Sequence, residues 1–237
     1  MATVPSAVAS NASLSPTRQP SNTFTLPPKV RIVSHPLALH KLSILRDKRV
    51  KSRQFREVLD EMALLLAMRS TQGLEVTTTQ TLESPISTYQ GVKLKDRIAV
   101  FPILRAGQGL VDGFLQMLPT ARVLHLGLYR EKSTLLPVEY FNKLPSECTI
   151  DLGYVLDPMI ATAGTAIAAV NILKDWGLKR IKFIAIVASR EGIESLAKAH
   201  PDIDIYVVAV DNELSKVGYI VPGLGDAGDR LYKTHHE

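Results

Sequence analysis

Short apolar runs alternate with helical patterns along most of this chain, and that alternation constrains the fold more than any other feature of the sequence. The expected strands are 76–79, 97–104, 121–128, 152–156, 180–188 and 203–210. The expected helices are 36–47, 52–69, 109–118, 165–176 and 191–200. Strands separated by helices of this length predict βαβ units, and therefore an α/β fold built on a mainly parallel sheet.

Composition excludes several other classes of protein. Of the 237 residues, 46% are apolar, which is enough to bury a sizeable core. No apolar run approaches the ~18 residues of a membrane-spanning helix, so we expect no membrane association. Cys148 is the only cysteine, which excludes an internal disulfide and a cysteine-rich zinc site, and the six histidines show no metal-ligand spacing.

The formal net charge of +5 comes from the amino-terminal end of the chain. Five basic residues and no acid precede Asp47, whereas 23 basic residues balance 23 acidic ones from Asp47 onward. A nucleic-acid surface would need lysines and arginines clustered on the folded body. We therefore expect no nucleic-acid partner.

Residues 1–28 differ from the rest of the chain, because alanine, serine, threonine and proline fill 18 of these 28 positions and no acid occurs there. Such a segment buries too little apolar surface to offset the entropy of ordering, so we expect a disordered arm followed by a single domain at 30–237. Two interpretations of the arm are open. It is either a tail on a cytoplasmic protein or a transit peptide for a plastid or another organelle.

The junction after the expected strand 152–156 has the composition of a phosphate-binding loop. Ligands of such folds bind beyond the carboxyl ends of the parallel strands. Here Asp157 ends a strand, and small residues then lead into a helix whose first amides can bind one phosphate. Asp157 suits a ribose diol, whose two hydroxyls can donate to a carboxylate. The alternative is an ordinary strand–helix turn in which Thr165 caps the helix.

A second glycine-rich segment lies near the carboxyl terminus. Residues 223–228 formally match G-x-G-x-x-G, but only nine residues follow, so a dinucleotide-binding unit does not fit. The segment is either a simple terminal turn or a backbone wall for a flat ligand. Asp226 and Asp229 lie in and just after it, and paired acids often act on Mg²⁺ through water.

Two arginines directly follow expected strands. Arg105 and Arg130 have a planar fork that suits phosphate oxygens. The alternative for either arginine is a structural salt bridge, with Glu131 or Glu139 as its partner. Both arginines are expected at the same edge of the sheet as Asp157, which favours anion binding.

These segments together resemble the uracil phosphoribosyltransferase family. The stretch 156–165 is similar to the family's phosphoribosyl-diphosphate motif, and its single acid before Pro158 is typical of the uracil branch. The ending 219–230 resembles the uracil-binding segment. Shorter matches occur in the same order at 35–37, 55–57, 102–107 and 137–138. The resemblance covers about 31–233 and implies an open, mainly parallel sheet flanked by helices, with a β flap at Tyr129–Tyr140.

The resemblance implies a reaction and a set of site residues. Uracil would attack C1 of 5-phospho-α-D-ribose 1-diphosphate (PRPP), giving UMP and diphosphate, with Mg²⁺ held through PRPP and water rather than directly by the protein. The implied PRPP-binding residues are Arg105, Arg130, Asp157, Pro158, Met159, Ile160, Ala161, Thr162, Ala163, Gly164, Thr165 and Asp226. The implied uracil-binding residues are Ile220, Gly225, Asp226 and Ala227. Of all these, Asp157, Asp226 and Arg105 would be the catalytic residues.

The resemblance also leaves alternatives open. It implies a homodimer or homotetramer and, in some relatives, GTP as an effector. The other hypotheses are a catalytically weak regulatory or binding protein on the same fold, and a transferase for another base such as a purine. One departure is Ala163, where the family usually has glycine; if the position requires positive φ, alanine costs roughly 1 kcal/mol or more.

Overall fold

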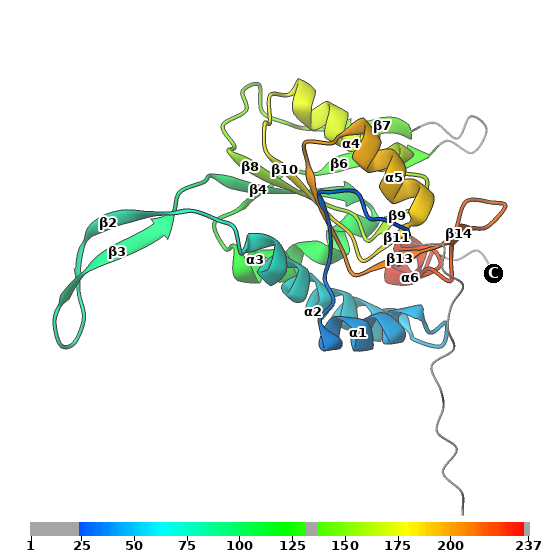
Figure 1. Cartoon of the computed structure of the whole chain (residues 1–237), viewed down its shortest axis with the longest axis horizontal. Coiled ribbons are helices and arrows are strands. Elements are labelled where there is room, and N and C mark those ends of the chain that lie inside the picture. The colour runs from blue at the N-terminus through cyan, green and yellow to red at the C-terminus, as the bar shows by residue number, and fades with distance from the viewer. Residues whose placement is uncertain (1–23, 131–136, 235–237) are drawn as a thin grey trace, which may run out of the picture.

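A mainly parallel sheet forms the centre of the protein (Figure 1) in the computed structural model, which describes residues 24–130 and 137–234. Within these residues the sheet has eight strands in the order β1-β12-β10-β8-β4-β6-β7, and β5 also pairs with β4. Its strands are β1 (Val30–Ile32), β4 (Ile98–Leu104), β5 (Arg122–Val123), β6 (Leu126–Arg130), β7 (Pro137–Asn142), β8 (Leu152–Leu156), β10 (Ile181–Ile184) and β12 (Asp204–Val207). Within the described part of this sheet only β7 pairs antiparallel, so the predicted mainly parallel α/β fold is confirmed.

Helices cover both faces of this sheet (Figure 1). The helices are α1 (Pro36–Arg46), α2 (Ser52–Thr71), the 3₁₀ helix η1 (Ala106–Leu110), α3 (Val111–Met117), α4 (Gly164–Asp175), α5 (Arg190–Ala199) and α6 (Ala227–Tyr232). One core lies between the sheet and α1, α2 and α3, and a second lies under α4 and α5. No helix in the described part of the chain is long and apolar enough to span a bilayer.

Two expected strands are each broken into two. The apolar run 180–188 separates into β10 and β11 (Val187–Ser189), and the run 203–210 separates into β12 and β13 (Ala209–Asp211). At the first break the Ile186 and Val187 amides donate to the Pro158 carbonyl. The chain thereby moves into a second parallel sheet, β13-β11-β9, where β9 is Met159–Ile160. The prediction of continuous strands was wrong because apolar periodicity does not show which neighbour a strand pairs with.

Some elements carried little sequence signal. The expected strand 76–79 is the start of β2 (Val76–Glu83), which pairs with β3 (Thr88–Leu94) in a hairpin that extends away from the body at the end opposite α6 (Figure 1). Most side chains of both strands are exposed, so no alternation of buried and exposed positions revealed the length of β2 or the existence of β3. The expected strand 121–128 is likewise divided, between β5 and β6.

The boundary between arm and body is not at residue 28. Phe24 and Leu26 are partly buried against the core under α4 and α5, and the Arg190 guanidinium lies 4.7 Å from the centroid of the Phe24 ring. The last residues of the segment that we expected to be disordered therefore pack on the body. Residues 1–23 lie outside the described part of the chain, so the expectation for them stays a prediction.

Candidate active site

The turn between β8 and α4 places a carboxylate at the carboxyl edge of the sheet. Asp157 directly follows β8, and its backbone amide donates to the Ile184 carbonyl at 3.1 Å, which continues the ladder to β10. Its carboxylate is partly buried and accepts the Met159 amide at 3.3 Å. Burial, and secondarily the charge of Asp226, raises the pKa of Asp157 to about 7, while the Met159 hydrogen bond opposes the rise.

The start of α4 has no side-chain cap. Thr165, which we considered as the cap, is the second residue of the helix; Ala163 occupies the capping position and makes no side-chain hydrogen bond there. The first amides of a helix have no partners within it and carry the positive end of its dipole. This end of α4 is therefore suited to an anion such as one phosphate. Ala163 adopts φ 65°, so this position has the left-handed conformation in which alanine is less favourable than the glycine usual in the family.

The last residue of β11, Ser189, which caps α5, holds the loop between β8 and α4 in place. The Ser189 hydroxyl caps α5 by accepting the Gly192 amide at 2.8 Å, and it also donates to the Ala161 carbonyl. Gly192 lies so close that a Cβ there would come 2.2 Å from the Ala161 oxygen. The loop shape thus depends on α5, which our sequence reasoning missed because the contact joins residues 28 positions apart.

The carboxyl-terminal glycine segment folds as a tight turn followed by α6. Gly223 and Gly225 have φ 56° and 71°, values that favour glycine. The glycine segment follows the short hairpin of β14 (Glu213–Leu214) and β15 (Ile220–Val221). The Asp226 carboxylate caps α6 by accepting the Asp229 amide at 2.9 Å. The segment is therefore a tight turn that leads into a capped helix.

Arg105 lies over this segment. Its guanidinium donates to the Asp229 carboxylate and to the Thr234 hydroxyl, both at 3.0 Å, and its side chain is about half exposed. The alternative prediction that Arg105 pairs with Glu139 was wrong, because Arg105 pairs with Asp229 of α6, near the end of the sequence. Arg130 ends β6, but its side chain and all of Glu131 lie outside the described residues, so its role stays a prediction.

The two segments share one cavity of about 600 Å³. The cavity is lined by Leu104, Arg105, Ala106, Leu128, Tyr129, Tyr140, Asp157, Met159, Ala161, Thr165, Asp226 and Gly228. Of the predicted site residues, the structure brings six to this wall: Arg105, Asp157, Met159, Ala161, Thr165 and Asp226. The lining does not include Pro158, Ile160, Thr162, Ala163, Gly164, Ile220, Gly225 or Ala227, which lie in the same two segments.

An aromatic pair forms one side of the cavity mouth. Tyr129 on β6 and Tyr140 on β7 have ring centroids 5.9 Å apart and are each about half exposed. Both line the cavity, at the place where the resemblance implied a β flap. The segment 131–136 between the two strands lies outside the described residues.

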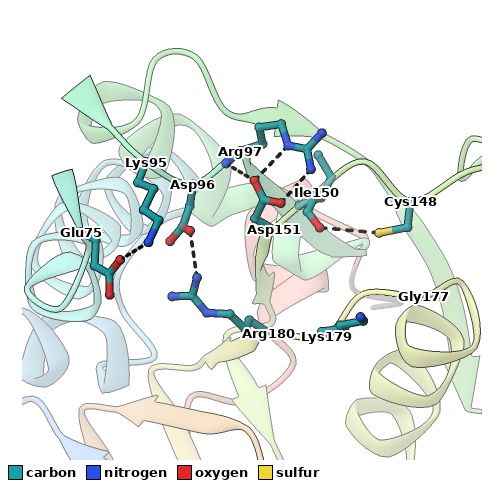
Figure 2. Close-up of a pocket in the computed structure, with 10 residues that line it drawn as sticks. All are labelled: Glu75, Lys95, Asp96, Arg97, Cys148, Ile150, Asp151, Gly177, Lys179 and Arg180. Carbon is teal, nitrogen blue, oxygen red and sulfur yellow. Dashed lines mark hydrogen bonds and ion pairs between the residues drawn. The ribbon is translucent and has the colours of Figure 1, made fainter. Parts of the chain in front are cut away.

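A second cavity, of about 640 Å³, lies at the opposite edge of the sheet, before the first residues of β4, β8 and β10 (Figure 2). Its cations are mostly neutralised by neighbouring acids. Figure 2 shows Lys95 paired with Glu75, Arg97 with Asp151 and Arg180 with Asp96. Paired charges make this cavity a poorer phosphate site than the uncapped start of α4.

Known proteins match nearly all of the described chain. The family model described as uracil phosphoribosyltransferase matches residues 32–234. A relative of that name from Roseiflexus castenholzii is 49% identical over 206 residues, covering 87% of this chain and 99% of the relative. Another, from Clostridium kluyveri, is 50% identical over 207 residues with the same coverage. The solved AQ2163 protein of Aquifex aeolicus matches with TM-score 0.82 and 31% identity, covering 88% of this chain and 100% of that protein.

Proposed function

Because the chain belongs to the uracil phosphoribosyltransferase family, we propose that it transfers the phosphoribosyl group of PRPP to uracil, giving UMP and diphosphate. One observation carries the proposal. The segment that follows β8 and the glycine segment that leads into α6 contribute walls to the same cavity. A reaction between a sugar phosphate and a base needs two such subsites side by side.

The sugar phosphate occupies the β8–α4 side. The 5-phosphate binds the amides and hydroxyls of 161–165, where the start of α4 has no side-chain cap. The Asp157 carboxylate accepts hydrogen bonds from the ribose hydroxyls. Arg105 and Arg130 bind the diphosphate, and Asp226 lies beside it. The described pairing of Arg105 with Asp229 holds the guanidinium at the cavity wall.

Uracil occupies the glycine side. Backbone groups at Ile220 and at 225–227 read its edge, with an N–H for O4 and a carbonyl for N3–H. Cytosine would place a donor where the site already offers a donor, so a buried polar group would stay unpaired. The absence of side chains at Gly225 permits the base to approach the backbone closely.

Catalysis then rests on position and charge. Loss of diphosphate leaves an oxocarbenium-like ribose, and holding the base in line with C1 is worth up to about 7–11 kcal/mol. Arg105 and Arg130 stabilise the charge that develops on the leaving group. The aromatic pair Tyr129 and Tyr140 at the cavity mouth limits the access of water to the activated sugar. The reaction demands no strong side-chain base.

The donor set fits Mg²⁺ held mainly by the substrate. Asp226 supplies a carboxylate at the cavity wall, and the described residues contain no group of three acids, histidines or cysteines that could hold an ion alone. Mg²⁺ usually keeps several waters and binds one or two carboxylates together with substrate phosphates. When bound, Mg²⁺ supplies charge neutralisation to the diphosphate.

A steady-state assay with PRPP against uracil, cytosine, hypoxanthine and orotate tests the function. We expect turnover with uracil alone. Turnover with hypoxanthine would favour the purine alternative, and no turnover with any base would favour the regulatory or binding protein.

We also propose a homodimer or homotetramer. The β2–β3 hairpin carries exposed apolar side chains, with Ile86 95% and Val92 63% exposed, and such a surface is typical of a subunit contact. Replacing both with serine is expected to lower the mass measured by light scattering; an unchanged mass would contradict a role of the hairpin.

Three further expectations stay predictions. GTP would act as an effector, which adding GTP to the same assay tests. The arm at 1–28 would be a transit peptide or an uncleaved cytoplasmic tail, and mass spectrometry of the native mature protein would distinguish the two. The single domain at 30–237 predicts that a chain lacking 1–23 retains full turnover.

A further inference from the structure

In the proposed function, backbone groups recognise uracil. The residues that hold this backbone in place therefore determine the preference for uracil over other bases. We assign little of the base recognition to the side chains of the glycine segment. The turn of this segment at Gly223 is tight. A Cβ at Gly223 would lie 2.2 Å from the Ile220 carbonyl oxygen. The position of Gly223 therefore sets the position of Ile220, one of the groups proposed to read uracil.

Both polar backbone atoms of Gly223 are held by one ion pair. The Gly223 amide donates to Oδ2 of Asp211 at 3.0 Å, and its carbonyl accepts from Nη1 of Arg46 at 3.1 Å. Arg46 and Asp211 are joined by two further hydrogen bonds, both 2.8 Å long. The four bonds form a closed network between the end of α1, the end of β13 and the glycine turn.

The pair is mostly buried but does not touch the substrate cavity. The side chains of Arg46 and Asp211 are 22% and 9% exposed, and neither lines the cavity. A bidentate guanidinium–carboxylate pair is geometrically rigid, and a buried one is costly to break from either side. The pair therefore holds the backbone of the turn in place and makes no direct contact with a ligand in the cavity.

We propose that Arg46 and Asp211 are positioning residues that hold the base-reading backbone and so set the affinity for uracil and its discrimination from cytosine. This inference rests on the proposed function. The neighbouring Arg230 supports it, because that side chain donates to the Leu224 carbonyl and to the Asp47 carbonyl, both at 2.8 Å, and thereby ties the same turn to the end of α1.

The test is Arg46→Lys, which keeps the charge but removes the fork and the bond to Gly223. We expect the KM for uracil to rise about tenfold and the preference for uracil over cytosine to fall, because about one hydrogen bond's worth of positioning is lost. We expect the KM for PRPP and kcat at saturating uracil to stay within about twofold. Hydrogen exchange should accelerate at 220–227 and not at 161–165.

Arg97→Lys is the matched control. Arg97 and Asp151 also form a bidentate pair, with bonds of 2.9 and 2.7 Å, but at the opposite edge of the sheet (Figure 2). That variant should leave both KM values unchanged. Equal rises of both KM values in Arg46→Lys, or no rise at all, would overturn the inference. If Arg46→Lys does not fold, Asp211→Asn takes its place, because it removes one of the two acceptor oxygens that hold Arg46 and Gly223, and the same split between the two KM values is expected. A wild-type protein that does not turn over uracil would instead reject the proposed function.

Discussion

The carboxylate of Asp226 accepts the backbone amide of Asp229 at 2.9 Å, so one acid both caps α6 and lines the cavity that the two segments share. The cap and the proposed catalytic role can be separated by substitution, because a helix cap needs only a hydrogen-bond acceptor, whereas the Mg²⁺ that we propose to accompany the diphosphate calls for a negative charge.

Asp226→Asn should therefore reduce kcat strongly, by about a hundredfold, with little change in the melting temperature. Asparagine caps helices as well as aspartate does. Asp226→Ala is the control for the cap and should additionally destabilise the protein by about 1 kcal/mol. Near-normal kcat/KM in Asp226→Asn would remove this acid from the proposed site.

Ala163→Gly should stabilise the protein. Ala163 adopts φ 65°, where a Cβ is unfavourable by roughly 1 kcal/mol, and glycine would release that strain without changing the loop. We expect a gain of about 1 kcal/mol in denaturant unfolding and undiminished turnover. Ala168→Gly, in the interior of α4, is the matched control and should cost about 1 kcal/mol instead. Equal effects at both positions would show that position 163 is not strained.

Stability should fall with rising pH because of Asp157. Its pKa is about 7 in the folded protein and 3.8 in its ordinary state, so the folded form keeps a proton that the unfolded form releases. The contribution is fully present below pH ~4 and is lost as the pH rises through ~7. Asp157→Asn should thus be more stable than wild type at pH 8, by an amount on the order of 1–3 kcal/mol, and equal to it at pH 4. A constant difference across this range would contradict the raised pKa.

The same titration should affect PRPP binding. A protonated Asp157 accepts from the ribose hydroxyls less well, so the KM for PRPP should rise as the pH falls below about 7. Phosphate groups of the substrate also titrate near pH ~6. Asp157→Asn separates the two causes, because any pH dependence that it retains comes from the substrate. A profile identical to that of wild type would show that Asp157 is not the group observed.

Gly192→Ala should displace the loop between β8 and α4, to which we assign phosphate binding, from outside the cavity. The added Cβ would lie 2.2 Å from the Ala161 carbonyl, and the loop would have to move. We expect the KM for PRPP to rise at least about tenfold, with a smaller effect on the KM for uracil. Gly73→Ala is the control, since a Cβ there meets nothing within 4 Å. If the two variants behave alike, α5 does not position the loop.

Local signals were sufficient for the β8–α4 junction. The strand 152–156 was predicted with its observed bounds, and the loop to Thr165 followed from an acid, small residues and a helical pattern in succession. Each of these features depends only on near neighbours along the chain. The same holds for α2, whose apolar residues recur at helical spacing and are buried in the observed helix.

Contacts between distant segments carried no such signal. The run 180–188 indicated one strand because seven of its nine residues are apolar. In the structure the chain passes from one sheet to another at Ile186, whose amide donates to the Pro158 carbonyl. The partner of Arg105 was likewise wrong in the sequence interpretation, because α6 approaches it from 124 positions away.

The sequence by itself determined the order of the main helices and of the central strands β4, β8, β10 and β12, the composition of the loop after Asp157, and the glycine content of the segment before α6, because these depend on periodicity and backbone freedom within a few residues. Only the tertiary structure decided that this loop and the glycine segment share a cavity, that Ala163 takes a left-handed conformation, and that Arg46 and Asp211, 165 positions apart, hold Gly223. Long-range packing chooses which of many compatible surfaces meet, and that choice is spread over the whole core rather than written in any one segment.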